Sequence, residues 1–219
     1  MIDFVLHHWY DLGVISFFLS LRYLARNQTT LTTAQKLLLA NFMAVLVHQF
    51  EEYRFPGGFP PAMNLGVHSS DRPDRYPLSS MSAFWTNVVA TYGFYLPPIF
   101  YPDQIWAGLG PVLFGFGQIF IHGINLNMKL GSFYNPGLGS TILMHVPLGY
   151  YYIRHTTSTG QLTGQQWVLG IAYCFAFLYA SLIKSTFGWL VDYNSPYPFS
   201  PAEMQRGGML EWIMRVRNL

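Results

Sequence analysis

The chain has 219 residues, of which 51% are hydrophobic, 18% are aromatic and only 10% are charged. Soluble domains average roughly 25% charged residues, so this composition indicates a membrane protein. The formal net charge of +2 is too small for the basic surface that nucleic-acid binding requires, so we expect no nucleic-acid partner. The single cysteine, Cys174, lies in an apolar segment and is expected to pack in the interior.

Apolar segments long enough to cross a bilayer, which takes about 20 residues, recur along the chain. In chain order they cover residues 4–24, 34–53, 81–101, 105–125, 139–153 and 165–185. Pro97, Pro98 and Pro102 separate the third segment from the fourth, because proline cannot continue a helix. The sequence therefore predicts an all-α, polytopic membrane helix bundle of about six spans, which forms one domain over residues 1–201.

Two further segments are expected outside the spans. Residues 54–80 form the longest connection, rich in proline, glycine and polar residues, which would either cap a site or remain solvated. Residues 202–219 are predicted to form a separate amphipathic C-terminal helix over 202–216. Its apolar residues would face lipid and its arginines the headgroups; these are Met209, Leu210, Trp212 and Ile213, and Arg206, Arg215 and Arg217.

Lysine and arginine residues predict the orientation, because cytoplasmic loops carry an excess of both. An even number of spans places both termini on the same side of the membrane. Eight basic residues fall on the terminal side, and four, namely Arg22, Arg26, Lys36 and Arg154, fall on the other. We therefore expect cytoplasmic termini; one span fewer would invert this assignment.

Three of the predicted spans carry a polar stripe with one histidine each. Each residue of an ideal helix advances by about 100°, so residues four or seven apart share a face. A narrow polar face on an apolar helix is buried against other helices. The stripes are Asn41, His48 and Glu52 on the second span, Gln118, His122, Asn125 and Lys129 on the fourth, and Thr141, His145 and Tyr152 on the fifth. Up-and-down connectivity puts the three histidines in one leaflet, so we expect them to converge.

Imidazole and carboxylate groups together are typical ligands of zinc, iron or manganese. We expect a divalent metal ion, zinc or iron, to bind between the helices, with the ligands His48, Glu52, His122 and His145. Glu51 or Glu52, whichever does not bind metal, would act as a general base. Asn125 would polarise a substrate carbonyl or hold a ligand in place.

Each of these residues also has a structural interpretation. Membrane histidines often form hydrogen bonds across helices without binding metal. Glu51 and Glu52 would otherwise cap the end of the helix in water and pair with Arg54. Lys129 is expected to extend toward the lipid headgroups.

Three short motifs occur together in the chain: His48-Gln49-Phe50-Glu51-Glu52, Arg54-Phe55-Pro56-Gly57-Gly58-Phe59-Pro60 and Tyr134-Asn135-Pro136-Gly137-Leu138. With these motifs, and in their spacing to His122, Asn125 and His145, the chain resembles the bacterial multi-pass membrane family named for its HxxEE motif. The resemblance covers most of the chain. It implies a small bacterial protein of the inner membrane and implies no particular activity. The turn at residues 135–137 reads as structural and would place Asn135 beside the site.

Three functions fit this expected site. The first is a membrane-embedded metalloenzyme, a hydrolase or oxidoreductase, acting on a membrane lipid or another apolar small molecule. The second is a metal-free lipid or sterol-type isomerase in which Glu51 or Glu52 shuttles a proton, with a layout loosely similar to the emopamil-binding sterol isomerase family. The third is a proton- or metal-ion carrier that uses the polar stripes as a pathway. The lack of an obvious internal repeat in the sequence argues against a carrier.

Overall fold

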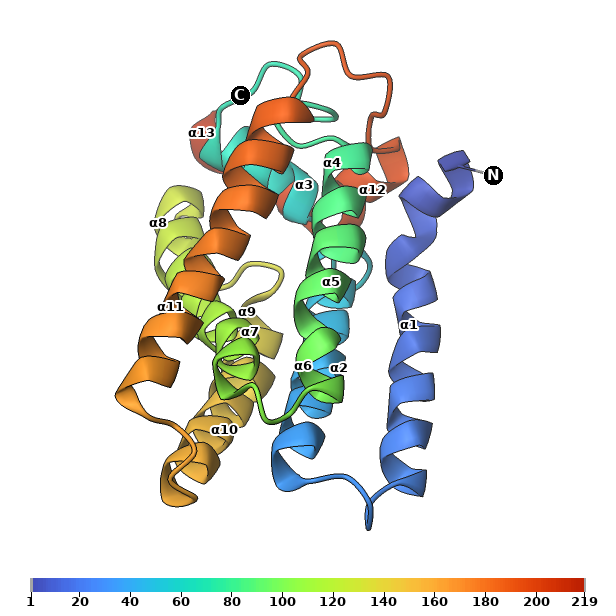
Figure 1. The fold of residues 1–219 in the computed structure, drawn as a ribbon. Coiled ribbons are helices and arrows are strands. Elements are labelled where there is room, and N and C mark those ends of the chain that lie inside the picture. Colours follow the sequence, from blue (N-terminus) through green and yellow to red (C-terminus); the bar gives the residue numbers. More distant parts are fainter. Residues whose placement is uncertain (1, 219) are drawn as a thin grey trace.

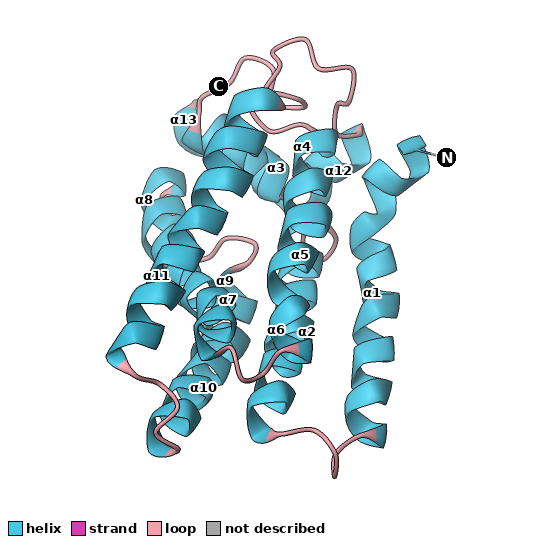
Figure 2. Cartoon of the chain, viewed as in Figure 1, coloured by secondary structure: helices cyan, strands magenta, loops and turns pink. Residues whose placement is uncertain are grey.

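All regular structure in this chain is helical: the computed structural model describes residues 2–218, and no strand occurs among them (Figure 2). Six long helical rods follow one another, and segments marked η within them are π-helical. The rods are α1 (Ile2–Arg26); α2 (Thr33–Tyr53); α4 (Ser80–Phe84), η2 (Trp85–Ala90) and α5 (Thr91–Tyr95); α7 (Ile105–Gln118), η3 (Ile119–Leu126) and α8 (Asn127–Leu130); α9 (Leu138–Ser140), η4 (Thr141–His145) and α10 (Val146–Ser158); and α11 (Gly164–Leu178) with η5 (Tyr179–Trp189).

Shorter helices connect the rods or close one end of the bundle. They are α3 (Phe59–Pro61), the π-helical η1 (Ala62–Val67), α6 (Pro97–Phe100), α12 (Pro201–Gln205), the 3-10 segment η6 (Arg206–Gly208) and α13 (Met209–Arg217). The sequence explains several of the helix starts. Thr32 caps α2 by accepting a bond from the Gln35 backbone N–H at 3.2 Å, and the Gln35 side chain accepts the Thr32 N–H at 3.0 Å.

Each of the six predicted spans coincides with one of the rods. Three helices, Ile2–Arg26, Ile105–Leu130 and Gly164–Trp189, are long and apolar enough to cross a membrane. They also leave large apolar side chains uncovered: Leu19 of α1 is 62% exposed, Phe175 of α11 is 66% exposed and Ile183 of η5 is 60% exposed. Continuous apolar surface of this kind marks a face that lipid or another protein covers.

The rods stand side by side, and both marked chain ends gather at one end of the molecule together with α3, α12 and α13 (Figure 1). α1 packs against α2, and α7 packs against α10 and α11. The apolar core between the rods includes Leu38, Phe42, Leu109, Val112 and Tyr152, each at most 3% exposed. η4 contacts both α2 and η3, and these three elements carry the three histidines of the predicted polar stripes.

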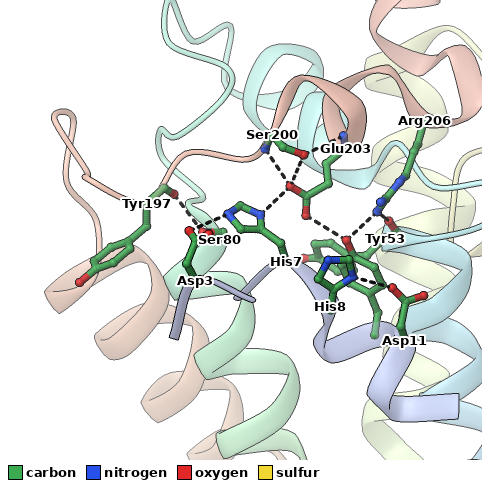
Figure 3. A network of polar contacts seen from close by, with 11 residues as sticks. Asp3, His7, His8, Asp11, Tyr53, Ser80, Tyr197, Ser200, Glu203 and Arg206 are labelled. Carbon is green, nitrogen blue, oxygen red and sulfur yellow. Dashed lines mark hydrogen bonds and ion pairs between the residues drawn. The ribbon is translucent and has the colours of Figure 1, made fainter. Parts of the chain in front are cut away.

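A polar network fastens α12 to the start of the bundle (Figure 3). Glu203 is 3% exposed, and its carboxylate contacts His7 Nδ1 at 2.7 Å and accepts a hydrogen bond from the Tyr10 hydroxyl at 3.1 Å. Arg206 donates to the Tyr10 hydroxyl at 2.7 Å and to the Tyr53 carbonyl at 2.5 Å. These contacts connect α12 and η6 to α1 and to the end of α2.

The C-terminal segment differs from the predicted continuous helix on the membrane surface. The chain turns at Gly207, whose φ of 64° is left-handed, so α12 and α13 are separate helices. Met209 and Ile213 pack against Leu126 and Leu130, and they are only 7% and 2% exposed. The expectation that Met209 and Ile213 meet lipid is therefore wrong, because the chain itself covers them, whereas Trp212 of the same helix is 38% exposed.

Residues 54–80 fold over the end of the bundle and form a cap. Asn64 is fully buried, and its side chain bonds to both backbone groups of Leu78. It accepts the Leu78 N–H at 2.9 Å and donates to the Leu78 carbonyl at 2.7 Å. Arg217 of α13 donates to the Leu65 carbonyl at 2.8 Å. His68 stays exposed on this cap. The cap is thus held by its own asparagine and by the C-terminal helix.

Candidate metal centre

Three buried side chains from two rods converge on one point. His48 and Glu52 lie one turn apart on α2, and His122 lies on η3. Glu52 Oε1 is 3.6 Å from His48 Nε2 and 3.4 Å from His122 Nε2. The three residues are 4%, 5% and 1% exposed, and their ligand atoms all lie within 4.8 Å of one another.

The other ring nitrogen of each histidine in this cluster already has a partner. His122 Nδ1 lies 2.7 Å from Asn135 Oδ1, which can only accept. His48 Nδ1 lies 3.0 Å from Ser140 Oγ, whose own hydrogen is donated to the Gly137 carbonyl at 3.2 Å. With the Ser140 hydrogen assigned to the Gly137 carbonyl, both Nδ1 atoms carry the proton, and both Nε2 atoms present lone pairs toward Glu52. Metal-binding histidines are oriented in the same way by such outer partners.

The turn at residues 135–137 holds the two imidazoles together. Asn135 is fully buried and also donates to the His122 carbonyl at 2.7 Å. Gly137 has a φ of +103°, and a Cβ there would meet the His122 ring and approach His48 Cε1 to 2.8 Å. Only glycine fits this position, because the backbone is left-handed and both rings touch it.

Glu51 lies next to the cluster in sequence and has a different task. One of its oxygens accepts the Tyr134 hydroxyl at 2.9 Å and the Gly139 N–H at 3.0 Å. The other accepts the Ser140 N–H at 2.7 Å. Glu51 thus binds the free amides at the start of the α9–η4 helix. Burial and the Glu51 carboxylate raise the pKa of Tyr134, so its hydroxyl remains a donor. This geometry gives Glu51 a role in fastening the α9–η4 helix to α2, and its predicted catalytic role stays a prediction.

His145 lies beside the cluster, outside ligand distance of the complete set. Its ring centroid is 5.5 Å from that of His48, compared with 4.9 Å between His48 and His122. His145 Nδ1 lies 3.1 Å from Asn41 Oδ1, and the buried His145 Nε2 has no hydrogen-bond partner among the described residues. The three histidines therefore share one depth, as the stripes predict, but His145 is a neighbour of the three-residue group and not a member of it.

The structure places Asn125 on the exposed side of η3, away from the site. The predicted position assumed a regular α-helix from His122 onward. η3 is π-helical, with hydrogen bonds from i to i+5, so its turns are wider and residues three apart no longer share a face. Asn135 occupies the place beside His122 instead. Lys129 is exposed as well.

A cavity of about 120 Å³ adjoins the cluster. His48, Glu52 and His122 form part of its wall, and the cap contributes Phe59, Met63 and Leu78. The remaining wall comes from other residues of α2 and from η2, α5, α7, η3 and η5, and it is mainly apolar. Its uncharged polar members include Gln118 and Asn87, together with Thr86, Thr91 and Thr186.

Asn87, Gly137 and Ser140 are site residues that the sequence-based assignment of roles did not include, whereas Asn135 lies beside the site, as the turn at residues 135–137 predicts. Asn87 carries a readable signal, since it is an isolated amide in the apolar segment 81–101. Its side chain donates to the Tyr53 hydroxyl at 3.3 Å, and its backbone carbonyl accepts from the Gln49 side chain at 2.6 Å. Ser140 carries no such signal, because its role depends on how the turn before it folds.

Comparison with known proteins supports the importance of this site. Residues 39–152 match a family model described as a protein of unknown function with HXXEE motif. The matched region includes His48, Glu52, His122 and the turn at residues 135–137. No curated protein and no solved structure matches the chain. Since the match covers more than half of the 219 residues, this chain belongs to the family of proteins with the HXXEE motif.

Proposed function

We propose that His48, Glu52 and His122 bind one divalent metal ion, zinc or iron, in a membrane-embedded enzyme. The supporting observation is the set of three facing lone pairs, two on imidazole Nε2 atoms and one on Glu52 Oε1. Two ligands that are each about 2.1 Å from a zinc ion lie about 3.4 Å apart in tetrahedral geometry. The distances from Glu52 Oε1 to the two nitrogens, 3.4 and 3.6 Å, agree with that separation.

The donor set and the cavity favour hydrolysis or oxidation of a lipid or another apolar molecule. Two histidines and one carboxylate are used by zinc hydrolases and by iron(II) oxygenases, which both keep positions open for substrate. A divalent ion held here would supply a Lewis acid or, if it is iron, a redox centre. The apolar wall of the cavity excludes water, and the amides of Asn87 and Gln118 could orient a carbonyl or hydroxyl group.

We further propose that all six rods cross the membrane, with both termini in the cytoplasm of a bacterial cell. Support comes from the three apolar helices, from the position of both chain ends at the same end of the bundle, and from the bias of eight basic residues against four. This arrangement makes the chain a multi-pass protein of the inner membrane and puts the metal centre in the cytoplasmic half of the bundle.

A metal-free lipid or sterol-type isomerase is the second candidate, and one observation favours it. Glu52 Oε1 lies between two imidazole nitrogens and also borders the apolar cavity. A proton bound by Glu52 and His48 could be added to one carbon of a double bond. A different proton would then be removed from the carbon adjacent to the other end of that double bond, so that the double bond moves by one position. This reaction needs no metal ion.

Metal analysis of the purified protein separates these two functions. We expect about one equivalent of zinc or iron in the natural protein, and its loss in His48→Ala and in Glu52→Ala, because each removes one of three ligands. Asn125→Ala, which changes an exposed residue on the same rod as His122, should keep the metal. Gel filtration in detergent checks that each variant folds. Metal-free natural protein that retains bound lipid would support the isomerase instead.

A further inference from the structure

The cavity beside the metal centre is too small to enclose a lipid. It measures about 120 Å³, whereas an engineered apolar cavity that binds benzene measures about 150 Å³. Only the reacting end of a long-chain molecule fits into this space. The rest of such a molecule must therefore lie outside the cavity wall. This inference rests on the proposed function and asks by which route the substrate reaches the site.

The wall of the cavity selects an uncharged group. No lysine or arginine occurs among the residues that line it, all of which the structure describes, and its one acidic member is Glu52. A phosphate or sulfate would lose its water there and would find no lysine or arginine side chain, only the proposed metal ion, whose charge the Glu52 carboxylate partly neutralises. Asn87 and Gln118 offer neutral hydrogen-bonding groups. The end that enters is thus a hydroxyl, a carbonyl, an ester or an amide.

A second hollow, of about 390 Å³, lies on the outer surface between the α4–α5 rod and the α11–η5 rod. Small side chains form much of its floor, among them Ala90, Gly93, Ala180 and Ser181. The two rods run next to each other on the same side of the molecule (Figure 1), and η2 contacts η5. The outer hollow is thus a groove along the seam between these two rods.

The same two π-helical segments border the inner cavity and the outer groove. η2 contributes Thr86 to the cavity and Trp85 to the groove, and η5 contributes Thr186 to the cavity and Ser185 to the groove. At the seam the hydroxyl groups of Thr86 and Thr186 contact each other. The contact between Thr86 and Thr186 therefore lies on the seam that borders both the inner cavity and the outer groove.

One aromatic pair fastens the seam: Phe94 and Phe177 stack with ring centroids 3.9 Å apart. His68 of the cap lies 5.8 Å from Phe187 and connects the cap to η5. Thr86 and Thr186 also donate to carbonyls of their own helices, at 3.0 and 2.8 Å. The two hydroxyls keep these bonds when the contact between them opens, so opening this contact breaks no hydrogen bond.

We propose that a neutral long-chain lipid, such as an alcohol, ester, amide or ketone, reaches the metal centre sideways through the seam between Thr86 and Thr186. Its reacting end occupies the inner cavity, and its hydrocarbon tail lies in the outer groove and in the surrounding bilayer. The apolar, exposed surface of η5 faces the medium from which such a molecule comes.

A cross-link across the seam tests this route. Thr86→Cys and Thr186→Cys are combined in a Cys174→Ala background, and the full-length protein is reconstituted in phosphatidylcholine nanodiscs. The probe is hexadecanol with a photoreactive diazirine next to the hydroxyl end, and labelled residues are mapped by mass spectrometry. We expect labelling at Gln118, Ile121 and His122 of the cavity wall. Oxidation to the disulfide should lower it by about tenfold or more, and reduction should restore it.

The controls separate the route from the chemistry. Each single cysteine variant should be labelled equally before and after oxidation, and the phosphate ester of the same probe should label the cavity poorly. Cavity labelling that survives the cross-link would overturn the sideways route, and equal labelling by the phosphate ester would overturn the neutral substrate. Metal content is measured in the same samples: gated labelling without any metal leaves this route intact and removes the metalloenzyme.

Discussion

Two clusters of histidine and carboxylate side chains in this chain have similar composition. In one the carboxylate accepts hydrogen bonds, and in the other it faces ring nitrogens that donate none. In the cluster of His7 and Glu203, the carboxylate contacts His7 at 2.7 Å and accepts from the Ser200 N–H at 2.7 Å, the Ser200 hydroxyl at 2.8 Å and the Tyr10 hydroxyl at 3.1 Å. In the cluster of His48, Glu52 and His122, the histidine N–H groups point away from the carboxylate, toward Ser140 and Asn135.

The difference separates a fastener from a site. A buried carboxylate surrounded by donors is satisfied, and it stabilises the contact between its elements. Buried lone pairs that face one another are unfavourable unless a cation or a proton lies between them. Glu51 and Glu52 repeat the contrast at adjacent positions, because Glu51 receives three donors and Glu52 faces two imidazole lone pairs.

Gly137→Ala should break the open cluster most completely. The added Cβ would overlap the His122 ring at a backbone position that already costs about 1–3 kcal/mol for alanine. We expect loss of bound metal, measured by elemental analysis. Gly160→Ala is the matched control, because Gly160 also has a positive φ, of 71°, and has open space around it. Equal metal content in the two variants would contradict this role of Gly137.

Asn135→Ala should weaken metal binding by about 10- to 100-fold, the usual effect of removing a group that orients a ligand. Without Asn135 Oδ1, the His122 proton is free to move to Nε2, and the lone pair then faces away from Glu52. Competition with a chelator measures the affinity. Asn125→Ala should bind metal as tightly as the natural protein, and a similar loss in both variants would contradict the assignment.

The sequence predicts the rods and the polar stripe on α2 well, because both follow from regular α-helical geometry. Long apolar segments determine where helices lie, and α2 is a regular α-helix, so Asn41, His48 and Glu52 share a face as predicted. Asn125 could not be placed, because nothing in the sequence announces that η3 is π-helical. Asn135 comes from a turn after the rod, and its approach to His122 depends on Gly137.

The C-terminal segment was predictable as helix and not as a contact surface. An amphipathic pattern states that one face needs an apolar partner, and it does not state which one. Met209 and Ile213 find that partner in Leu126 and Leu130, more than seventy positions earlier in the chain. Contacts over such separations leave no periodic signal in a single sequence.

Glu203→Gln should lower stability and leave the metal in place, which sharpens the contrast between the clusters. A neutral amide cannot accept all four donors equally well, and leaving a buried donor unpaired costs about 1–3 kcal/mol. The thermal unfolding temperature in detergent micelles measures the effect. Glu211→Gln is the control, because Glu211 is exposed. Loss of metal in Glu203→Gln would show that the two clusters are not independent.

Tyr134→Phe should have the smallest effect, about 0.5–1.5 kcal/mol of stability, because it removes one of the three donors to Glu51. The raised pKa of Tyr134 makes a second prediction. Since the folded state holds the proton more tightly, the stabilisation is fully present below the ordinary pKa of 10.0 and is lost as the pH rises beyond it. The difference in unfolding temperature between natural protein and variant should therefore be constant near neutral pH and shrink in alkali. Tyr101→Phe, at a site that is 67% exposed, should show no such difference, and a pH-independent gap for Tyr134→Phe would mean that the hydroxyl does not hold Glu51.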